Sequence, residues 1–152
     1  MKTAIRVGTL EDLAAIQSCV RETYSAYIPV LGKPPAAMLT DFLPLIAAGQ
    51  VHVLDLDGEV IGTVTLKTDR TYLEISMLAV LPRFQSRGWG RRLMAYAENN
   101  ANELGLSEVR LYTNQKLDHL VRYYQNLGFV ETTRMQDAGY QRVFMSKSLV
   151  EN

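Results

Sequence analysis

The chain has 152 residues, of which 47% are hydrophobic and 21% are charged, as in ordinary globular proteins. Sixteen basic residues balance sixteen acidic residues, so the net charge does not support a general role in binding nucleic acid or a membrane surface. The single cysteine, Cys19, rules out an internal disulfide and fits a reducing compartment. With no signal peptide and no apolar run of membrane-spanning length, we expect one cytoplasmic domain over residues 1–152.

The first fifty residues predict one strand and two helices. Ala4–Val7 reads as a short strand. Thr9 resembles a helix N-cap with Asp12 as its capping-box acid, and the helix should continue to about Tyr27. Prolines and a glycine then indicate a loop, followed by a second helix over Ala36–Ala48. Cys19 lies in the first helix, where a small buried hydrophobic residue is the expected role.

Three antiparallel strands come next, over Val51–Leu56, Val60–Leu66 and Tyr72–Leu81, with Asp57-Gly58 as a hairpin turn. His52 in the first of them is assigned no chemistry. The expected elements after residue 90 are a helix over Arg91–Leu104, a strand over Val109–Thr113, a helix that buries Leu117, Leu120, Val121, Tyr124 and Leu127, and strands near Phe129–Thr133 and Tyr140–Lys147. The pattern predicts a mixed α/β (α+β) domain: one mixed, mostly antiparallel sheet of about seven strands, flanked by four helices.

Residues 85–90, Gln-Ser-Arg-Gly-Trp-Gly, lie between a predicted strand and a predicted helix. Gly88 and Gly90 let the backbone approach a ligand, and a helix start offers N–H groups that attract anions. Four arginines lie close by, at positions 83, 87, 91 and 92. This stretch therefore predicts a site for a phosphorylated ligand. The third glycine of the dinucleotide fingerprint and the Gly-Lys-Ser/Thr of nucleoside-triphosphate loops are both absent.

The same stretch resembles motif A of the GNAT superfamily, the acetyl-CoA-dependent N-acetyltransferases. That motif reads Gln/Arg-x-x-Gly-x-Gly/Ala after a strand that ends in Val-x-Pro, and here Val80-Leu81-Pro82 precedes Gln85. Trp89 departs from the smaller aliphatic residue usual in the family. The order of the predicted elements also matches the GNAT fold, so the resemblance covers nearly the whole chain.

A second segment, Tyr124-Gln125-Asn126-Leu127-Gly128-Phe129, resembles the family's motif B, Tyr-x-x-x-Gly-Phe. Upstream, Asn114 follows Tyr112-Thr113 and resembles a Leu-x-Thr-Asn variant found in part of the family. Leu117 and Leu120 stand where that variant often has methionine and asparagine. The asparagine often bonds the pantetheine arm of the cofactor, and Leu120 cannot make that bond.

The resemblance implies acetyl-CoA as cosubstrate, and it assigns binding roles residue by residue. No metal is expected, because the sequence has no ligand-spaced Cys/His cluster. Backbone groups of Leu78, Ala79 and Val80 would pair with pantetheine, and an N–H near Leu78 or Ala79 would face the thioester carbonyl. The loop Gln85, Ser86, Arg87, Gly88, Trp89, Gly90 and Arg91 would hold the pyrophosphate, and Asn114 would also bind the cofactor. Which arginine reaches the 3′-phosphate stays open.

Acetyl transfer to an amine also needs a base for the amine and a proton donor for the departing thiolate. The family's motif-B tyrosine points at the cofactor sulfur, so we favour Tyr124 as the acid over its neighbour Tyr123. Glu74 is the candidate base, Glu108 is its rival, and a water chain is also possible for this step. His119 in a helix first turn is expected to be solvated. No acyl-enzyme is expected, since Cys19 has no evident base partner.

We therefore predict direct transfer of the acetyl group from acetyl-CoA to a primary amine in a ternary complex. The acceptor would be a small-molecule or peptide amine, bound by the loop Ile28–Ala37 and the turn Arg134–Gly139. The sequence does not decide between a monomer and a homodimer. The leading alternative is a non-catalytic acyl-CoA-binding or regulatory module on the same fold. A nucleotide-binding module unrelated to acyl transfer is a third hypothesis.

Overall fold

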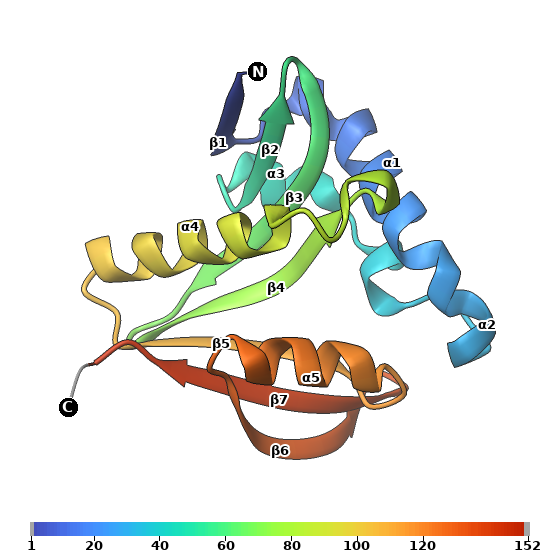
Figure 1. The fold of residues 1–152 in the computed structure, drawn as a ribbon, viewed down its shortest axis with the longest axis vertical. Helices are drawn as coiled ribbons and strands as arrows, with labels where there is room; N and C mark the ends of the chain where they lie inside the picture. Colours follow the sequence, from blue (N-terminus) through green and yellow to red (C-terminus); the bar gives the residue numbers. More distant parts are fainter. Residues whose placement is uncertain (1, 151–152) are drawn as a thin grey trace. The chain divides into compact units, whose positions relative to one another are not determined.

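The computed structural model describes residues 2–150. Its strands form a seven-stranded sheet in the order β1-β2-β3-β4-β5-β7-β6 (Figure 1). Pairing is parallel between β4 and β5 and antiparallel for β1–β2, β2–β3, β5–β7 and β6–β7. The predicted mixed, mostly antiparallel sheet is therefore confirmed. The chain divides into two compact units, one running up to Leu66 and resuming over Met77–Ala97, the other made of Lys67–Ser76 and the chain from Glu98 onward.

The first unit contains the amino-terminal elements and the start of the central helix. Its strands are β1 (Thr3–Val7), β2 (Val51–Leu56), most of β3 (Glu59–Thr68) and the end of β4 (Tyr72–Val80). Its α-helices are α1 (Leu13–Tyr24), α2 (Ile28–Leu31), α3 (Phe42–Ala47) and the first part of α4 (Trp89–Glu103). Within residues 2–150, no helix combines the length and the hydrophobicity needed to cross a membrane.

Both predicted amino-terminal helices are broken into shorter pieces. The first consists of a 3₁₀ turn over Leu10–Asp12, helix α1 and a 3₁₀ turn over Ser25–Tyr27, and helix α2 follows inside the segment that was predicted to be a loop. The second consists of a 3₁₀ turn over Ala36–Leu39 and helix α3. The break in the second has a local cause, because Thr40 is extended, with ψ 133°, and Asp41 caps α3 by accepting the Leu43 N–H at 3.2 Å.

The β2–β3 hairpin confirms the Asp-Gly turn. Asp57 and Gly58 have φ angles of 52° and 89°, which is the left-handed region that the two-residue type I′ turn requires. The Asp55 carboxylate accepts the Gly58 N–H at 2.7 Å and stabilises the turn from the strand side. Strand β3 extends beyond the predicted Val60–Leu66 at both ends, because the hairpin ladder begins at Glu59.

A close contact sets α4 against β3 and β4. An added Cβ at Gly62 would lie 3.1 Å from the Ala79 carbonyl oxygen and 3.2 Å from Leu93 Cδ1. Gly62 therefore permits a spacing that a larger residue would widen. Leu93, Met94 and Ala97 of α4 are fully or almost fully buried and form the apolar face of the helix.

The second unit contains the start of β4, the end of α4, and the elements β5 (Glu108–Asn114), α5 (Asp118–Asn126), β6 (Val130–Asp137) and β7 (Tyr140–Ser148). Strands β4, β5 and β7 alternate buried and less buried residues. The buried face carries Leu73, Val109, Val143 and Met145, and helix α5 runs beside β5 and β7 in Figure 1. The opposite face carries Glu74, Tyr112 and Phe144, whose side chains are only half-buried.

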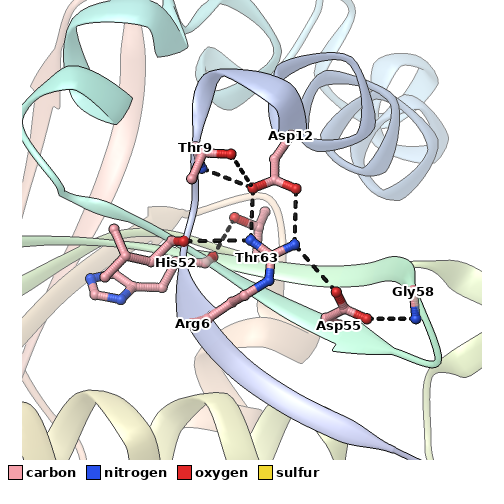
Figure 2. A network of polar contacts seen from close by, with 8 residues as sticks. Arg6, Thr9, Asp12, His52, Asp55, Gly58 and Thr63 are labelled. Atoms are coloured by element: carbon pink, nitrogen blue, oxygen red, sulfur yellow. Dashed lines mark hydrogen bonds and ion pairs between the residues drawn. The ribbon is translucent and has the colours of Figure 1, made fainter.

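An ion-pair network joins β1, β2 and the start of the first helical segment (Figure 2). Arg6 donates from Nη1 to Asp12 Oδ2 at 2.8 Å and from Nη2 to Asp55 Oδ2 at 3.2 Å. The Thr9 N–H donates to Asp12 Oδ2 at 2.8 Å, which confirms Asp12 as the capping-box acid. The Arg6 guanidinium, followed by the Thr9 N–H, lowers the pKa of Asp12 to about 2 against the opposing effect of burial.

We expect Asp12→Asn to lower the free energy of unfolding by about 1–2 kcal/mol at pH 7, because the ion pair with Arg6 is lost and the hydrogen bond from the Thr9 N–H is no longer charge-assisted. Since the folded-state pKa lies below the unfolded value, the contribution is complete above about pH 4 and is lost as pH falls toward 2. Urea denaturation between pH 7 and pH 2 should show the difference from wild type shrinking in acid. Glu11→Gln, at the exposed neighbouring residue, is the control, and an equal loss there would contradict this role for Asp12.

Candidate functional site

The loop after β4 has the backbone conformation of an anion-binding turn. A 3₁₀ turn over Pro82–Phe84 leads to Gln85, and α4 begins at Trp89, two residues earlier than predicted. Ser86 and Gly88 adopt left-handed φ angles of 62° and 87°. The Arg92 N–H donates to the Gly88 carbonyl oxygen at 3.1 Å, which is the first hydrogen bond of helix α4. The backbone N–H groups of the residues before Arg92 therefore have no acceptor within the helix. Such a run of N–H groups at a helix start favours phosphate.

The motif glutamine connects this loop to the strand before it. Gln85 Nε2 donates to the Val80 carbonyl oxygen at 2.9 Å, while the Gln85 N–H donates to the Pro82 carbonyl oxygen at 3.2 Å. The loop is therefore held to the end of β4 by a side chain as well as by the backbone. This contact explains structurally why a side chain with an amide donor suits position 85.

The four arginines around the loop have different partners. Arg83 forms ion pairs with Glu59 and with Glu22, so its charge is largely compensated. The Arg87 guanidinium lies 5.8 Å from the Phe84 ring centroid, and that of Arg92 lies 4.9 Å from the Trp89 ring. Arg91 is exposed in the first turn of α4, which contains no acidic residue. Arginines 87, 91 and 92 are thus better candidates than Arg83 for binding a phosphate.

The end of β4 continues past its partner strand. Strands β4 and β5 pair over Tyr72–Ile75 and Glu108–Leu111, whereas β4 runs on to Val80 and β5 to Asn114. Leu78 is half-buried, and Ala79 and Val80 are buried. This segment leads directly into the loop, so the predicted cofactor-binding residues from Leu78 to Arg91 form one continuous stretch of the first unit.

Two residues that the sequence analysis did not select also contact this segment. Tyr24 Oη donates to the Leu78 carbonyl oxygen at 2.9 Å, and Thr23 Oγ1 lies 3.1 Å from the Val80 carbonyl oxygen. Both side chains come from the last turn of α1. They lie 57 and 54 positions from their acceptors Val80 and Leu78 in the sequence, and no local motif marks them.

Tyr124 is buried on α5, with 9% of its surface exposed. Its ring makes edge contacts with the rings of Tyr123 and Phe129, at centroid distances of 5.3 and 6.0 Å. The Phe129 N–H donates to the Tyr124 carbonyl oxygen at 3.0 Å, which closes the helix end at Gly128. The Tyr-x-x-x-Gly-Phe motif therefore has a structural role in ending α5, alongside any role in chemistry.

Glu74 and Glu108 occupy the same less-buried face of the second unit but differ in their partners. Arg110 Nε donates to Glu108 Oε1 at 2.7 Å, and the Ser146 hydroxyl also donates to it. The Arg110 contact, followed by that of Ser146, lowers the Glu108 pKa. Within residues 2–150, the Glu74 carboxylate forms no ion pair or hydrogen bond. Glu74 is therefore the better placed of the two to accept a proton.

Asn114 has a local role at the end of β5. Its Oδ1 accepts the Lys116 N–H at 2.9 Å, and its carbonyl oxygen accepts the Leu117 N–H at 3.0 Å. The side-chain oxygen thus shapes the turn into α5. The side-chain amide nitrogen of Asn114 takes no part in this turn and would be the natural donor to a cofactor.

The burial and contacts of Cys19, His52 and His119 give none of them a role in catalysis. Cys19 is buried, and burial is the main cause that raises the pKa of its thiol to about 12, so it is a poor nucleophile. His52 Nδ1 lies 2.7 Å from Tyr96 Oη, and burial lowers the His52 pKa. His119 is exposed in the first turn of α5, as expected. Across the described part of the chain, no group of three or more His, Cys, Asp or Glu residues could hold a metal ion.

Comparison with protein families matches residues 16–129 to the acetyltransferase (GNAT) family. Among solved structures, PaiA N-acetyltransferase from Thermoplasma acidophilum in complex with coenzyme A is 23% identical, with a TM-score of 0.79 over 97% of this chain and 99% of that chain. Ard1 from Thermoplasma volcanium is 24% identical, with a TM-score of 0.74 over 99% of this chain and 100% of that chain.

The ribosomal-protein-S18-alanine N-acetyltransferase from Escherichia coli is 16% identical, with a TM-score of 0.77 over 99% of this chain and 96% of that chain. At these identities the likeness to solved structures shows the fold. A comparison with curated protein sequences found no match.

Proposed function

This chain belongs to the acetyltransferase (GNAT) family, and we propose that it transfers the acetyl group of acetyl-CoA to a primary amine in a ternary complex. The observation that carries the proposal is the continuous stretch from Leu78 to Arg91. It combines strand backbone beyond the β4–β5 ladder with a left-handed turn and the start of α4. The family match covers parts of both compact units, which supports their action as one domain.

The cofactor fits the residues present in the first unit. Backbone N–H groups at Gly88, Trp89 and Gly90 would receive the pyrophosphate. Arginines 87, 91 and 92 would add positive charge there, whereas the charge of Arg83 is compensated by its ion pairs. The exposed loop leaves a ligand free to approach, since an added Cβ at Gly88 would meet nothing within 4 Å. Acetyl-CoA supplies an activated acyl group, and PaiA N-acetyltransferase, which shares the fold, was solved in complex with coenzyme A.

Three groups would serve the chemical step. Glu74 would take a proton from the ammonium or attacking amine, directly or through water, because its carboxylate has no competing partner among the described residues. The N–H of Leu78 or Ala79 would stabilise the negative charge that develops on the carbonyl oxygen. As the nitrogen–carbon bond forms and the carbon–sulfur bond breaks, Tyr124 would give its proton to the departing thiolate. We assign no role in acyl transfer to Cys19.

The acceptor would be a small-molecule or peptide amine. The segment Ile28–Ala37 includes helix α2 and the following turn, and Arg134–Gly139 forms the exposed β6–β7 turn. Loops with such exposure commonly carry specificity. A cytoplasmic location is consistent with one buried, reduced cysteine and stays a prediction.

The central test measures free thiol release from acetyl-CoA with a panel of amines, including peptides, amino acids, polyamines and aminoglycosides. We expect saturable, amine-dependent turnover, and thermal stabilisation of about 2.7 kcal/mol by coenzyme A at a hundred times its Kd. Coenzyme A binding without turnover of any amine would favour the non-catalytic module instead. Stronger stabilisation by ATP or NAD would overturn the assignment.

Tyr124→Phe should lower kcat by about 100-fold, because the thiolate would leave without its proton donor. Coenzyme A affinity should stay nearly unchanged, since the ring and its contacts with Phe129 are retained. Tyr123→Phe is the matched control on the same helix and should keep wild-type kcat. Equal kcat in wild type and Tyr124→Phe would remove Tyr124 from the mechanism.

Glu74→Gln should lower kcat/KM for the amine by about 100-fold, with the largest loss near neutral pH, where a base is needed most. Glu108→Gln is the matched comparison and should change kcat/KM little, because Arg110 and Ser146 already hold that carboxylate and lower its pKa. A large loss in Glu108→Gln alone would assign the base to Glu108. Normal rates in both variants would point to a water chain.

A further inference from the structure

The last turn of α1 holds the backbone of β4 through hydroxyl groups. Tyr24 Oη donates to the Leu78 carbonyl oxygen at 2.9 Å. Thr23 Oγ1 is 3.1 Å from the Val80 carbonyl oxygen and also 2.7 Å from the Cys19 carbonyl oxygen. Because a hydroxyl has one hydrogen, Thr23 shares its bond between two acceptors. Tyr24 therefore makes the stronger of the two contacts.

These contacts fall at a strand edge that β5 no longer covers. The β4–β5 ladder ends at Ile75. On the other edge of β4, the Leu81 N–H donates to the Ile61 carbonyl oxygen of β3 at 2.9 Å, so Leu81 and Ala79 direct their polar groups toward β3. Alternate residues of a strand direct their N–H and C=O groups to the same edge. Leu78 and Val80 therefore direct theirs to the edge that faces β5 earlier in the strand. With the ladder ended, these polar groups need other partners.

A hydroxyl group and a neighbouring strand engage different backbone groups of the strand edge. A strand would engage both the N–H and the C=O groups along the edge, whereas Tyr24 engages a C=O group. It restrains the Leu78 carbonyl group and does not compete for an N–H donor, which is the group that a ligand's carbonyl oxygen would need. Fixed donors stabilise developing negative charge better than mobile ones, because they need no reorganisation during the reaction.

We propose that Tyr24 is a positioning residue for acyl transfer, assisted by Thr23, and that it fixes the β4 backbone that receives the thioester carbonyl. This inference rests on the proposed function. The ring of Tyr24 packs edge-on against Tyr27 at a centroid distance of 5.9 Å, so the phenol is oriented from both ends. The ligand class that such an edge suits is an acyl thioester.

The test compares wild type with Tyr24→Phe, using acetyl-CoA labelled with ¹³C at the thioester carbonyl. Infrared difference spectra should show a lowered carbonyl stretch in the wild-type complex and a clearly smaller shift in the variant. We expect kcat to fall about threefold to tenfold, as for loss of one hydrogen bond, with coenzyme A affinity unchanged. A purely structural role would lower thermal stability without altering the carbonyl stretch of the bound ligand.

Matched variants keep the result interpretable. Tyr27→Phe removes a hydroxyl from the neighbouring ring and should leave the carbonyl stretch as in wild type. Thr23→Val should reduce the shift less than Tyr24→Phe, and Thr23→Ser should restore it, which provides a second measurement if Tyr24→Phe fails to fold. Wild-type binding with an identical carbonyl stretch and kcat in Tyr24→Phe would overturn this inference alone. Failure of wild type to bind acetyl-CoA would overturn the proposed function together with it.

Discussion

The β4–β5 ladder ends at Ile75 and Leu111, and this limited pairing determines what the rest of the site must do. Backbone groups beyond the ladder would be costly if they were buried without partners. In the first unit, Tyr24 and Gln85 provide such partners, one from α1 and one from the loop. The strand end is thereby held by side chains, and in our proposal the N–H groups of the same segment are assigned to the thioester.

Ion pairs also distinguish between candidate site residues that the sequence alone left equivalent. Arg83 and Glu108 have the right chemistry for phosphate binding and for proton transfer, yet each is engaged in ion pairs. Arg91 and Glu74 have comparable sequence positions and remain exposed or half-buried. Ion pairs between exposed side chains contribute little stability, but they can still decide which charge meets a ligand.

The sequence predicted the features that depend on local chemistry. The type I′ turn at Asp57-Gly58 and the capping acid Asp12 follow from short-range preferences, and both are confirmed. The helix predicted over Ala36–Ala48 was wrong in the middle, because the Asp41 side chain competes with helical backbone bonds. The contact of Tyr24 with Leu78 joins residues 54 positions apart, and no periodicity or motif encodes such a pairing.

Gly62, by having no side chain, links the core of the first unit to the position of helix α4. Its missing side chain lets the Ala79 carbonyl and Leu93 approach β3, so the depth at which α4 begins depends on a buried position with no functional group. A methyl group there would press against the Ala79 carbonyl oxygen and Leu93, which would have to move by a few tenths of an ångström. Substitution of Gly62 would then alter the packing behind the proposed cofactor loop, although the position itself carries no functional group.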